Sequence, residues 1–370
     1  MKTRKKAWLI LENGDQFEGQ SFGFEGNSSG EVVFNTSMTG FELSLTDPSY
    51  YGQILTFTFP LVGNFGVPDS ERDEYGLLKF FESEKIWPFG VIMTNASENF
   101  SHHRAVQSLE NFLKKQKIPA ITCIDTRKLT KILRDKGSLL GQIVIDKKAK
   151  LNTIKDPNQE NLVDKVSIKK TKIYTPKNFK KTILLIDTGV KNNIIRCFLK
   201  RKIRVVQVPW DTVLKDFNFK INQQNIKING LFLSNGPGDP KKVFSKITAN
   251  ISLALEKNIP IFGICLGNQI LSLALGGNTY KLPYGHRGVN QPVQNLENEK
   301  CFITSQNHGF AVDEKKLPKD FKVWFKNLND GSVEGIKHIK KPIFSVQFHP
   351  EACPGPQDTE FLFDEFLKNL

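Results

Sequence analysis

The stretch from residue 181 to residue 275 alternates between short apolar runs and amphipathic segments, and this alternation constrains the fold most strongly. A continuous apolar run of this kind is typical of a strand that is buried on both faces of a sheet. The expected strands are Ile183–Ile186, Val205–Val208, Gly230–Ser234 and Ile259–Ile264, and the expected helices are residues 190–202, 247–257 and 266–275. Strands that alternate with helices predict parallel βαβ units, with right-handed crossovers and helices on both faces of the sheet.

The first part of the chain has a different pattern, in which strand-like segments outnumber helical ones. Two of these segments flank Asn13-Gly14, a dipeptide typical of hairpin turns. Strands are expected at residues 7–11, 16–24, 31–34, 53–59 and 90–94, and helices from Ser101 to about Lys117 and from Asp125 to Gly137. This pattern predicts a mixed αβ domain.

A chain of 370 residues exceeds one ordinary domain, so two domains are expected. Between about Lys147 and Lys181 the sequence is rich in Lys, Asn and Pro and has weak periodicity, which is typical of a linker. The predicted division is an N-terminal domain over residues 1–150, a lysine-rich linker over 151–180 and a second domain over 181–370.

The formal charge of +14 raises the question of nucleic-acid binding. However, the basic residues are spread along the chain among 38 acidic ones, and no nucleic-acid motif is present. We therefore expect solvated surface lysines and no nucleic-acid partner, although a basic surface also suits an acidic protein partner.

The five cysteines are scattered and odd in number, which argues for a reducing compartment and against a disulfide framework. Residues 258–280 carry no charge, but proline and several glycines interrupt them, so they fit a strand and a buried helix better than a membrane span. Residues 7–11 are too short for the apolar core of a signal peptide. A cytoplasmic protein without membrane association is expected.

The segment Gly263-Ile264-Cys265-Leu266-Gly267 lies between an expected strand and an expected helix. It is the thiol counterpart of a nucleophile elbow, in which small residues let the chain turn sharply and expose one side chain. A Cβ at either glycine would crowd the adjoining strand and helix. The start of the helix presents free N–H groups, which stabilise a negatively charged sulfur. A buried structural cysteine is the alternative, but the context favours Cys265 as a nucleophile.

A thiolate nucleophile needs a base, and the base needs an orienting partner. The apolar run at residues 344–348 predicts a strand that delivers His349-Pro350-Glu351 at its end. With a separation of two residues, the side chains of His349 and Glu351 are expected on one side of an extended segment. Together with the elbow they predict a Cys265–His349–Glu351 triad, whereas alone they would fit an exposed loop. The other histidines show no such pairing, and no metal site is predicted.

Acyl transfer also needs donors for a developing oxyanion. The backbone N–H of Leu266 is one expected donor, and the glycine-rich turn at residues 235–240 offers another. No Gly-Lys-Ser/Thr follows that turn, so it is not a phosphate-binding loop, and any ATP-driven step is expected in a partner.

The chain resembles the class I glutamine amidotransferases. Four of its segments look like family motifs in the family's order: residues 234–240, 263–267, 306–310 and 347–351. Further segments narrow the resemblance to the small subunit of carbamoyl-phosphate synthase, and it covers nearly the whole chain. These segments are Phe34-Asn35-Thr36-Ser37-Met38-Thr39-Gly40, Leu45-Thr46-Asp47-Pro48-Ser49-Tyr50, Asp125-Thr126-Arg127-Lys128-Leu129-Thr130 and Asp187-Thr188-Gly189-Val190-Lys191-Asn192-Asn193.

This resemblance implies a flavodoxin-like amidotransferase domain with a largely parallel sheet behind a distinct N-terminal αβ domain. It implies that Cys265 is the nucleophile, His349 the general acid and base, and Glu351 its orienting partner. The residues that match glutamine-binding or oxyanion positions are Ser49, Gly236, Gly238, Leu266, Gln269, Asn307, Gly309 and Phe310.

The resemblance also implies a partner and a reaction. The chain would hydrolyse L-glutamine through a γ-glutamyl thioester and pass ammonia through a protein tunnel to a large subunit. That subunit would bind ATP and Mg²⁺ and make carbamoyl phosphate from bicarbonate for arginine and pyrimidine synthesis. No cofactor is expected in this chain, and a heterodimer is the expected assembly.

Two departures from the family pattern stand out. Asn268 replaces a histidine that is usual after Cys-Leu-Gly, and residues 41–44 differ before the Leu45–Tyr50 segment. We expect the first to tune glutamine hydrolysis or its coupling to the partner, without loss of activity. Three other functions stay open at this point: a glutaminase subunit of another synthase, a catalytically silent interaction subunit, and a stand-alone thiol peptidase or γ-glutamyl hydrolase.

Overall fold

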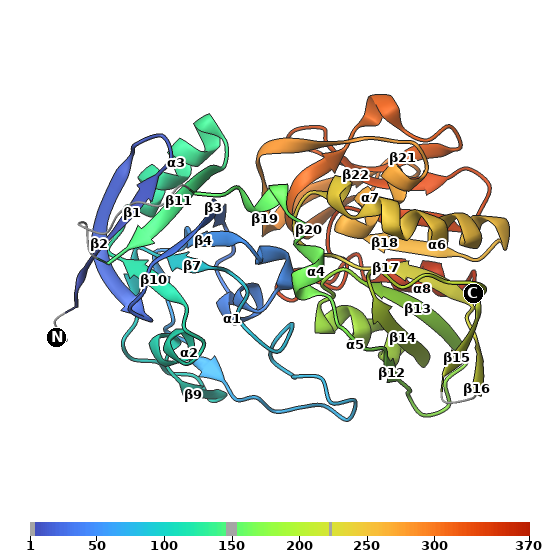
Figure 1. Ribbon diagram of the computed structural model, residues 1–370, viewed down its shortest axis with the longest axis horizontal. Coiled ribbons are helices and arrows are strands. Elements are labelled where there is room, and N and C mark those ends of the chain that lie inside the picture. Colours follow the sequence, from blue (N-terminus) through green and yellow to red (C-terminus); the bar gives the residue numbers. More distant parts are fainter. Residues whose placement is uncertain (1–3, 146–153, 222–223) are drawn as a thin grey trace. The chain divides into compact units, whose positions relative to one another are not determined.

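The computed structural model describes residues 4–145, 154–221 and 224–370, and the chain divides into two compact units. Unit 1 comprises residues 1–160 together with 283–288, and unit 2 comprises residues 161–282 and 289–370 (Figure 1).

Unit 1 is built on a closed barrel with the strand order β1-β11-β3-β4-β7-β10-β2. The barrel strands are β1 (Lys6–Leu11), β2 (Gln16–Gly23), β3 (Ser28–Asn35), β4 (Gln53–Phe57), β7 (Gly90–Ile92), β10 (Pro119–Thr122) and β11 (Leu139–Val144). Strands β1 and β2 form the expected hairpin around Gly14, which has a φ of 89°. Alternate residues of β1, such as Ala7 and Leu9, are fully buried in the barrel core.

Besides two short 3-10 helices, unit 1 contains three α-helices and four short strands outside the barrel in the described part of the chain. They are α1 (Phe41–Leu45), α2 (Leu109–Lys115), α3 (Thr126–Lys136), β5 (Leu61–Val62), β6 (Val67–Pro68), β8 (Asn95–Ala96) and β9 (Ala105–Gln107). The helix predicted from Ser101 is wrong in its first turns, because residues 105–107 form β9. Helix α2 begins only after Ser108, whose hydroxyl caps it by accepting from the backbone N–H of Asn111.

Unit 2 contains a ten-stranded sheet in the order β12-β14-β13-β17-β18-β23-β22-β20-β19-β21. Its parallel part consists of β13 (Lys181–Asp187), β14 (Ile203–Pro209), β17 (Gly230–Leu233), β18 (Ile261–Ile264) and β23 (Ile343–Val346). Numbered along the chain, these five strands lie in the order 2-1-3-4-5, which is the flavodoxin-like order. The predicted flavodoxin-like domain is thereby confirmed.

Helices cover both faces of this parallel part, as the alternation in the sequence predicts (Figure 1). On one face α6 (Phe244–Glu256) and α7 (Leu266–Ala274) pack on strand residues such as Leu184 and Leu231. On the other face Phe232 and Phe262 contact aromatic side chains of α5 (Asn192–Lys200) and α8 (Phe361–Leu367). Since successive strand residues point to opposite faces, the continuous apolar runs supply both layers.

The remaining strands of unit 2 extend or flank the parallel part. They are β12 (Lys172–Tyr174), β15 (Asn218–Ile221), β16 (Gln224–Lys227), β19 (Thr279–Asn295), β20 (Cys301–Val312), β21 (Phe321–Asn327) and β22 (Val333–His338), and residues 283–288 of β19 belong to unit 1. Strands β22 and β23 pair antiparallel, so the sheet changes direction beyond the fifth parallel strand.

The predicted linker, residues 151–180, overlaps the boundary between the units. Residues 151–153 lie outside the described residues, and the boundary falls after Glu160. From there on, unit 2 already contains the short helix α4 (Val163–Val166) and the edge strand β12, which pairs with β14.

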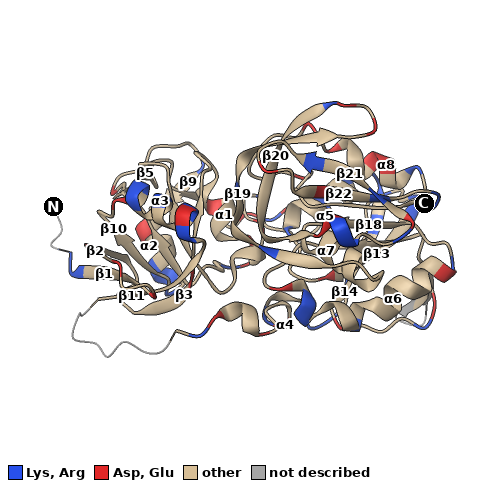
Figure 2. Cartoon of the chain, turned by 90° about the horizontal axis from the view of Figure 1, so that it is seen from above, with Lys and Arg blue, Asp and Glu red and all other residues tan. Residues whose placement is uncertain are grey.

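In Figure 2 the positions of Lys and Arg are interspersed with those of Asp and Glu along the ribbon of both units. Several are close pairs, such as Arg72 with Glu84 at 2.7 Å and Lys337 with Glu297 at 3.0 Å. None of the helices in the described part of the chain has the length and apolar character needed to cross a bilayer.

Candidate active site

Cys265 connects the end of β18 to the start of α7 in a strained backbone conformation. Its φ is 55° and its ψ is −104°, a combination that non-glycine residues rarely adopt. Its backbone N–H donates to the carbonyl of Val346 on β23 at 2.8 Å, and its carbonyl accepts from the N–H of Asn268 at 3.1 Å. The residue is therefore held from both sides, as a nucleophile elbow requires.

The two glycines of the elbow have the steric role expected from the sequence. A Cβ at Gly267 would collide with the carbonyl oxygen of Leu233 on β17. A Cβ at Gly263 would lie 2.8 Å from the backbone of Gly267. Helix α7 can approach the sheet this closely only because both positions lack a side chain.

His349 and Glu351 come together just beyond β23. Nδ1 of His349 lies 2.7 Å from Oε1 of Glu351, and both side chains are buried. The expected pairing is present, but the expected extended backbone is wrong: the N–H of Ala352 donates to the carbonyl of His349 at 3.0 Å, so the pair forms across a turn. Nδ1 donates to the carboxylate, which fixes the imidazole ring.

A buried lysine lies behind this pair. Nζ of Lys191 is 3.0 Å from Oε1 of Glu351 and 2.6 Å from the carbonyl oxygen of Ala352. Only 3% of Lys191 is exposed, and Nδ2 of Asn193 donates to the carbonyl of Glu351 at 2.6 Å. The start of α5 thus holds Glu351 through both its side chain and its backbone.

These charges set the protonation of the buried pair. Burial would raise the pKa of Glu351, but Lys191 and His349 lower it to about 2. Burial would lower the pKa of His349, but Glu351 and Cys265 raise it to about 10. At neutral pH the arrangement therefore favours a carboxylate at Glu351 and an imidazolium at His349.

The sulfur of Cys265 is almost fully buried and faces both His349 and β20. Its Sγ lies 3.6 Å from the carbonyl oxygen of Asn307. Nε2 of His349 is buried without a hydrogen-bond partner among the described residues, although Cys265 raises the pKa of the ring. Cys265 thus influences the charge of the imidazole although Nε2 makes no hydrogen bond among the described residues, and catalytic hydrogen bonds are often long or poorly aligned before substrate binds.

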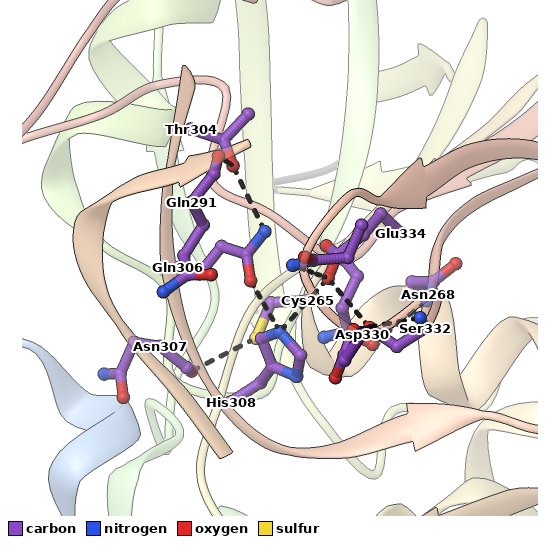
Figure 3. Close-up of polar contacts among 12 residues, drawn as sticks. Cys265, Asn268, Gln291, Thr304, Gln306, Asn307, His308, Asp330, Ser332 and Glu334 are labelled. Carbon is purple, nitrogen blue, oxygen red and sulfur yellow. Dashed lines mark hydrogen bonds and ion pairs between the residues drawn. The ribbon is translucent and has the colours of Figure 1, made fainter. Parts of the chain in front are cut away.

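The segment from Gln306 to Phe310 of β20 is fixed by its own side chains (Figure 3). Thr304 Oγ1 donates to the carbonyl of Gln291 at 2.9 Å and accepts from Nε2 of Gln306 at 3.1 Å. Oε1 of Gln306 lies 3.1 Å from Nε2 of His308. The other ring nitrogen of His308 lies 2.8 Å from the carbonyl of Phe310. This chain of contacts orders the strand that carries the predicted binding residues Asn307, Gly309 and Phe310.

The glycine turn after β17 closes another side of the site. A Cβ at Gly236 would collide with the carbonyl oxygen of Thr188, and Gly238 has a φ of 84°. The hydroxyl of Thr188 donates to the carbonyl of Asn235 at 2.9 Å, so the turn is tied to the end of β13. As predicted for a doubly wound sheet, these residues and Cys265 lie beyond the carboxyl ends of parallel strands.

The remaining predicted residues lie in two places. Leu266 and Gln269 are on the first turns of α7, where Gln269 Nε2 donates to the carbonyl of Phe310 at 2.8 Å. Ser49 lies in unit 1, in a short 3-10 turn whose start is capped by Asp47. The roles of Ser49, Gly236, Gly238, Leu266, Gln269, Asn307, Gly309 and Phe310 in binding stay predictions.

Sequence reasoning gave no role to Lys191, and it did not predict the hydrogen bonds that join Asn268 to Ser345 and Gln347. The position of Lys191 in the sequence could have indicated a role. It follows the carboxyl end of a buried parallel strand, and active sites of such sheets lie at that edge. For the group around Asn268, the polar residues Ser345 and Gln347 within an apolar strand were the only sign.

Comparisons with known proteins match both units. The family model described as carbamoyl-phosphate synthase small chain, CPSase domain, matches residues 9–143, and that of glutamine amidotransferase class-I matches residues 184–369. A glutamine amidotransferase of known structure from Thermotoga maritima is 19% identical, with a TM-score of 0.37, over 46% of this chain and 76% of that one.

Two curated relatives are similar over nearly the whole chain. The multifunctional protein CAD of Squalus acanthias is 50% identical over 98% of this chain, which spans only 16% of that protein. The carbamoyl phosphate synthase arginine-specific small chain of Neurospora crassa is 46% identical, over 100% of this chain and 80% of that one. Since the family's own N-terminal domain is matched together with the amidotransferase domain, the chain belongs to the carbamoyl phosphate synthase small chain family.

Proposed function

We infer that this chain hydrolyses L-glutamine and supplies the ammonia to a carbamoyl-phosphate synthase large subunit. The observation that carries this function is the placement of Cys265, at a strained strand–helix elbow, beside the buried pair of His349 and Glu351. A silent interaction subunit has no need of a buried, charge-compensated pair next to a strained cysteine, because such groups cost stability.

The first half of the reaction releases ammonia. The thiolate of Cys265 attacks the side-chain carbonyl carbon of glutamine, and the carbonyl electron pair moves to oxygen. The N–H groups of Gly238 and Leu266 are the proposed donors to this oxyanion. When the intermediate collapses, the carbon–nitrogen bond breaks and the imidazolium of His349 gives its proton to the leaving nitrogen. A γ-glutamyl thioester and ammonia result.

The second half releases glutamate. Neutral His349 takes a proton from water, and the resulting hydroxide attacks the thioester carbon. The carbon–sulfur bond breaks, so glutamate leaves and the thiolate of Cys265 and the imidazolium of His349 are restored. Glu351 stays ionised throughout and holds the ring, because Lys191 and His349 keep its pKa near 2.

The partner supplies the rest of the chemistry. ATP and Mg²⁺ are assigned to the large subunit, which uses bicarbonate and the channelled ammonia to make carbamoyl phosphate. We place this heteromeric enzyme in the cytoplasm, and assign no cofactor to the present chain. In relatives such as protein CAD the equivalent region is part of a much longer chain.

The thioester is the direct test of this function. The chain is mixed with L-glutamine, with and without a large subunit, quenched in acid and analysed by intact mass. We expect glutamate release together with a fraction of protein that carries one γ-glutamyl group on the peptide containing Cys265. Glutamate release without this adduct, even after rapid quenching, would favour direct attack by water.

The buried pair predicts a pH dependence. Because the pKa of His349 is raised from 6.5 to about 10, its proton is available to the leaving group at neutral pH and is lost as pH rises through 10. We expect kcat/KM for glutamine to fall over that alkaline range. The same contacts stabilise the folded state fully below the ordinary histidine value, and this contribution disappears as pH rises through 10. Initial rates across the range, on protein shown to remain folded, check this; a constant rate contradicts it.

Gly267→Ala tests the elbow. The new Cβ collides with the carbonyl of Leu233, so the start of α7 must move away from β17. A misplacement of about 1 Å can cost roughly a hundredfold in rate, and we expect a loss of that size in kcat/KM for glutamine. Gly276→Ala, beyond the other end of α7, is the control: it adds backbone strain at a φ of 89° in open space and leaves the elbow in place. Equal activity of the two variants would contradict the steric role of Gly267.

A further inference from the structure

Asn268 belongs to a buried polar group that connects α7 to β23 beside the nucleophile. Its other members are Gln269, Ser345 and Gln347, and each of the four residues is at most 2% exposed. Asn268 and Gln269 follow Cys265 on the first turn of α7. Buried amides and hydroxyls are costly unless they are hydrogen-bonded, so the directions of these bonds decide what the group does.

The backbone carbonyl of Phe310 determines which side-chain atom donates and which accepts in each of these hydrogen bonds. The carbonyl oxygen of Phe310 can only accept, so the side-chain atom of Gln269 that lies 2.8 Å from it is Nε2. The same Nε2 lies 3.1 Å from Gln347, which must therefore present Oε1. Since that oxygen accepts, its contact with Asn268 at 3.2 Å is a bond donated by Nδ2.

The chain of bonds ends on a serine. With Nδ2 of Asn268 facing Gln347, Oδ1 accepts from the hydroxyl of Ser345 at 2.9 Å. Asn268 thus accepts from Ser345 of β23 and donates to Gln347, which lies just beyond the end of that strand. The bond from Asn268 orients the side-chain amide of Gln347, whose Oε1 also accepts a hydrogen bond from Nε2 of Gln269.

The consequence lies at Gln269. Both of its N–H groups are engaged, one with Phe310 and one with Gln347, so Oε1 is the atom it can offer to a ligand. An oxygen held in a fixed direction accepts from an N–H group of bound glutamine without a further loss of side-chain entropy. If the Gln269 amide rotated, it would present a donor instead.

We propose that Asn268, together with Ser345 and Gln347, is a positioning residue that holds the Gln269 amide in the orientation that accepts an N–H group of L-glutamine. This proposal rests on the proposed glutamine hydrolysis and deepens it. It also gives a reason for asparagine at this position: it supplies one acceptor and one donor, as a neutral imidazole does. The proposal predicts an effect on substrate binding and little effect on the chemical step.

The test compares steady-state kinetics of glutamine hydrolysis by the full chain with its large subunit. Asn268→Leu is expected to raise KM for glutamine about tenfold, the factor that corresponds to roughly 1.4 kcal/mol, with kcat changed less than about twofold. Asn268→His is expected to restore most of the wild-type KM. A fall in kcat at unchanged KM, or an unchanged KM in a folded Asn268→Leu protein, would overturn the proposal.

A matched pair of serine variants distinguishes the loss of a specific hydrogen bond from a general effect on packing. Ser345→Ala removes the donor to Asn268, whereas Ser272→Ala removes an equally buried hydroxyl of α7 that has no hydrogen-bond partner among the described residues. We expect only Ser345→Ala to raise KM, about threefold or more. Equal shifts in the two variants would reduce the role of the group to packing.

A binding measurement separates this proposal from the proposed function. Calorimetric titration of L-glutamine into the full chain carrying Cys265→Ala reports affinity without turnover. We expect Asn268→Leu in this background to weaken binding by the same factor as KM. If the wild-type chain bound glutamine but did not hydrolyse it, the proposed function would be wrong. The affinities measured with and without Asn268→Leu would still test the role of Asn268. Equal affinity with and without Asn268→Leu would exclude that role.

Discussion

Cys265→Ala is expected to abolish glutamine-dependent carbamoyl phosphate synthesis by the assembled enzyme while synthesis from added ammonia continues at the unmodified rate. The variant lacks the sulfur atom that is proposed to form the thioester, and loss of a nucleophile costs at least about a thousandfold in kcat. Ammonia supplied from solution bypasses this step, because the proposed large subunit consumes the ammonia. The measurement is carbamoyl phosphate formation by the reconstituted complex with each nitrogen source.

Cys197→Ala is the matched control for this experiment. Cys197 is also buried in unit 2, on α5, where burial raises the pKa of its thiol and the side chain packs outside the site. We expect both nitrogen sources to remain usable in this variant. Loss of both activities in a folded Cys265→Ala complex, or retention of both, would be incompatible with Cys265 as the glutamine-specific nucleophile.

Lys191→Met is expected to destabilise the chain by about 3–5 kcal/mol and to reduce glutamine hydrolysis strongly. Removing one partner of a buried ion pair leaves the other charge uncompensated, and here that charge is the carboxylate of Glu351. Without Lys191 the pKa of Glu351 rises, because Lys191 is the largest of the influences that lower it. Protonation of Glu351 would then remove the acceptor that orients His349.

Urea unfolding monitored by circular dichroism gives the stability, and the glutaminase assay gives the activity. Lys200→Met removes an exposed lysine from the other end of the same helix and serves as the control, with an expected change within about 0.5 kcal/mol. If Lys191→Met unfolded at the same urea concentration as Lys200→Met and kept full activity, the ion pair would have no role in holding the site.

Much of the fold of unit 2 could be predicted from local patterns in the sequence. The apolar runs at 183–186 and 261–264 became parallel strands because residues buried on both faces have few alternatives. The elbow was predictable for a steric reason, since two glycines flank one cysteine at a strand–helix junction. The proximity of His349 and Glu351 followed from their separation of two residues, although the backbone between them turns.

The contacts that pattern reasoning missed join residues far apart in the chain. Lys191 and Glu351 are separated by 160 positions, and Asn268 and Gln347 by 79. Neither pair leaves a periodic signal, because a contact between two single residues far apart in the chain has no repeat in the sequence. The closed barrel of unit 1 was missed for a related reason. The sequence of a short strand indicates that it is a strand, but it does not indicate which strands it pairs with. The start of α2 was misplaced because β9 precedes its cap at Ser108.

The backbone of Cys265 is engaged on three sides at once. Its N–H donates to the carbonyl of Val346 on β23, and its carbonyl accepts from the N–H groups of Asn268 and Gln269. A change in its φ or ψ would break these hydrogen bonds. A reactive group fixed in this way has no rotation of its own main chain through which it can be switched off. Any control that the proposed large subunit exerts on this site is therefore expected to act on access to the sulfur, on the charge of its neighbours, or through a concerted movement of whole strands.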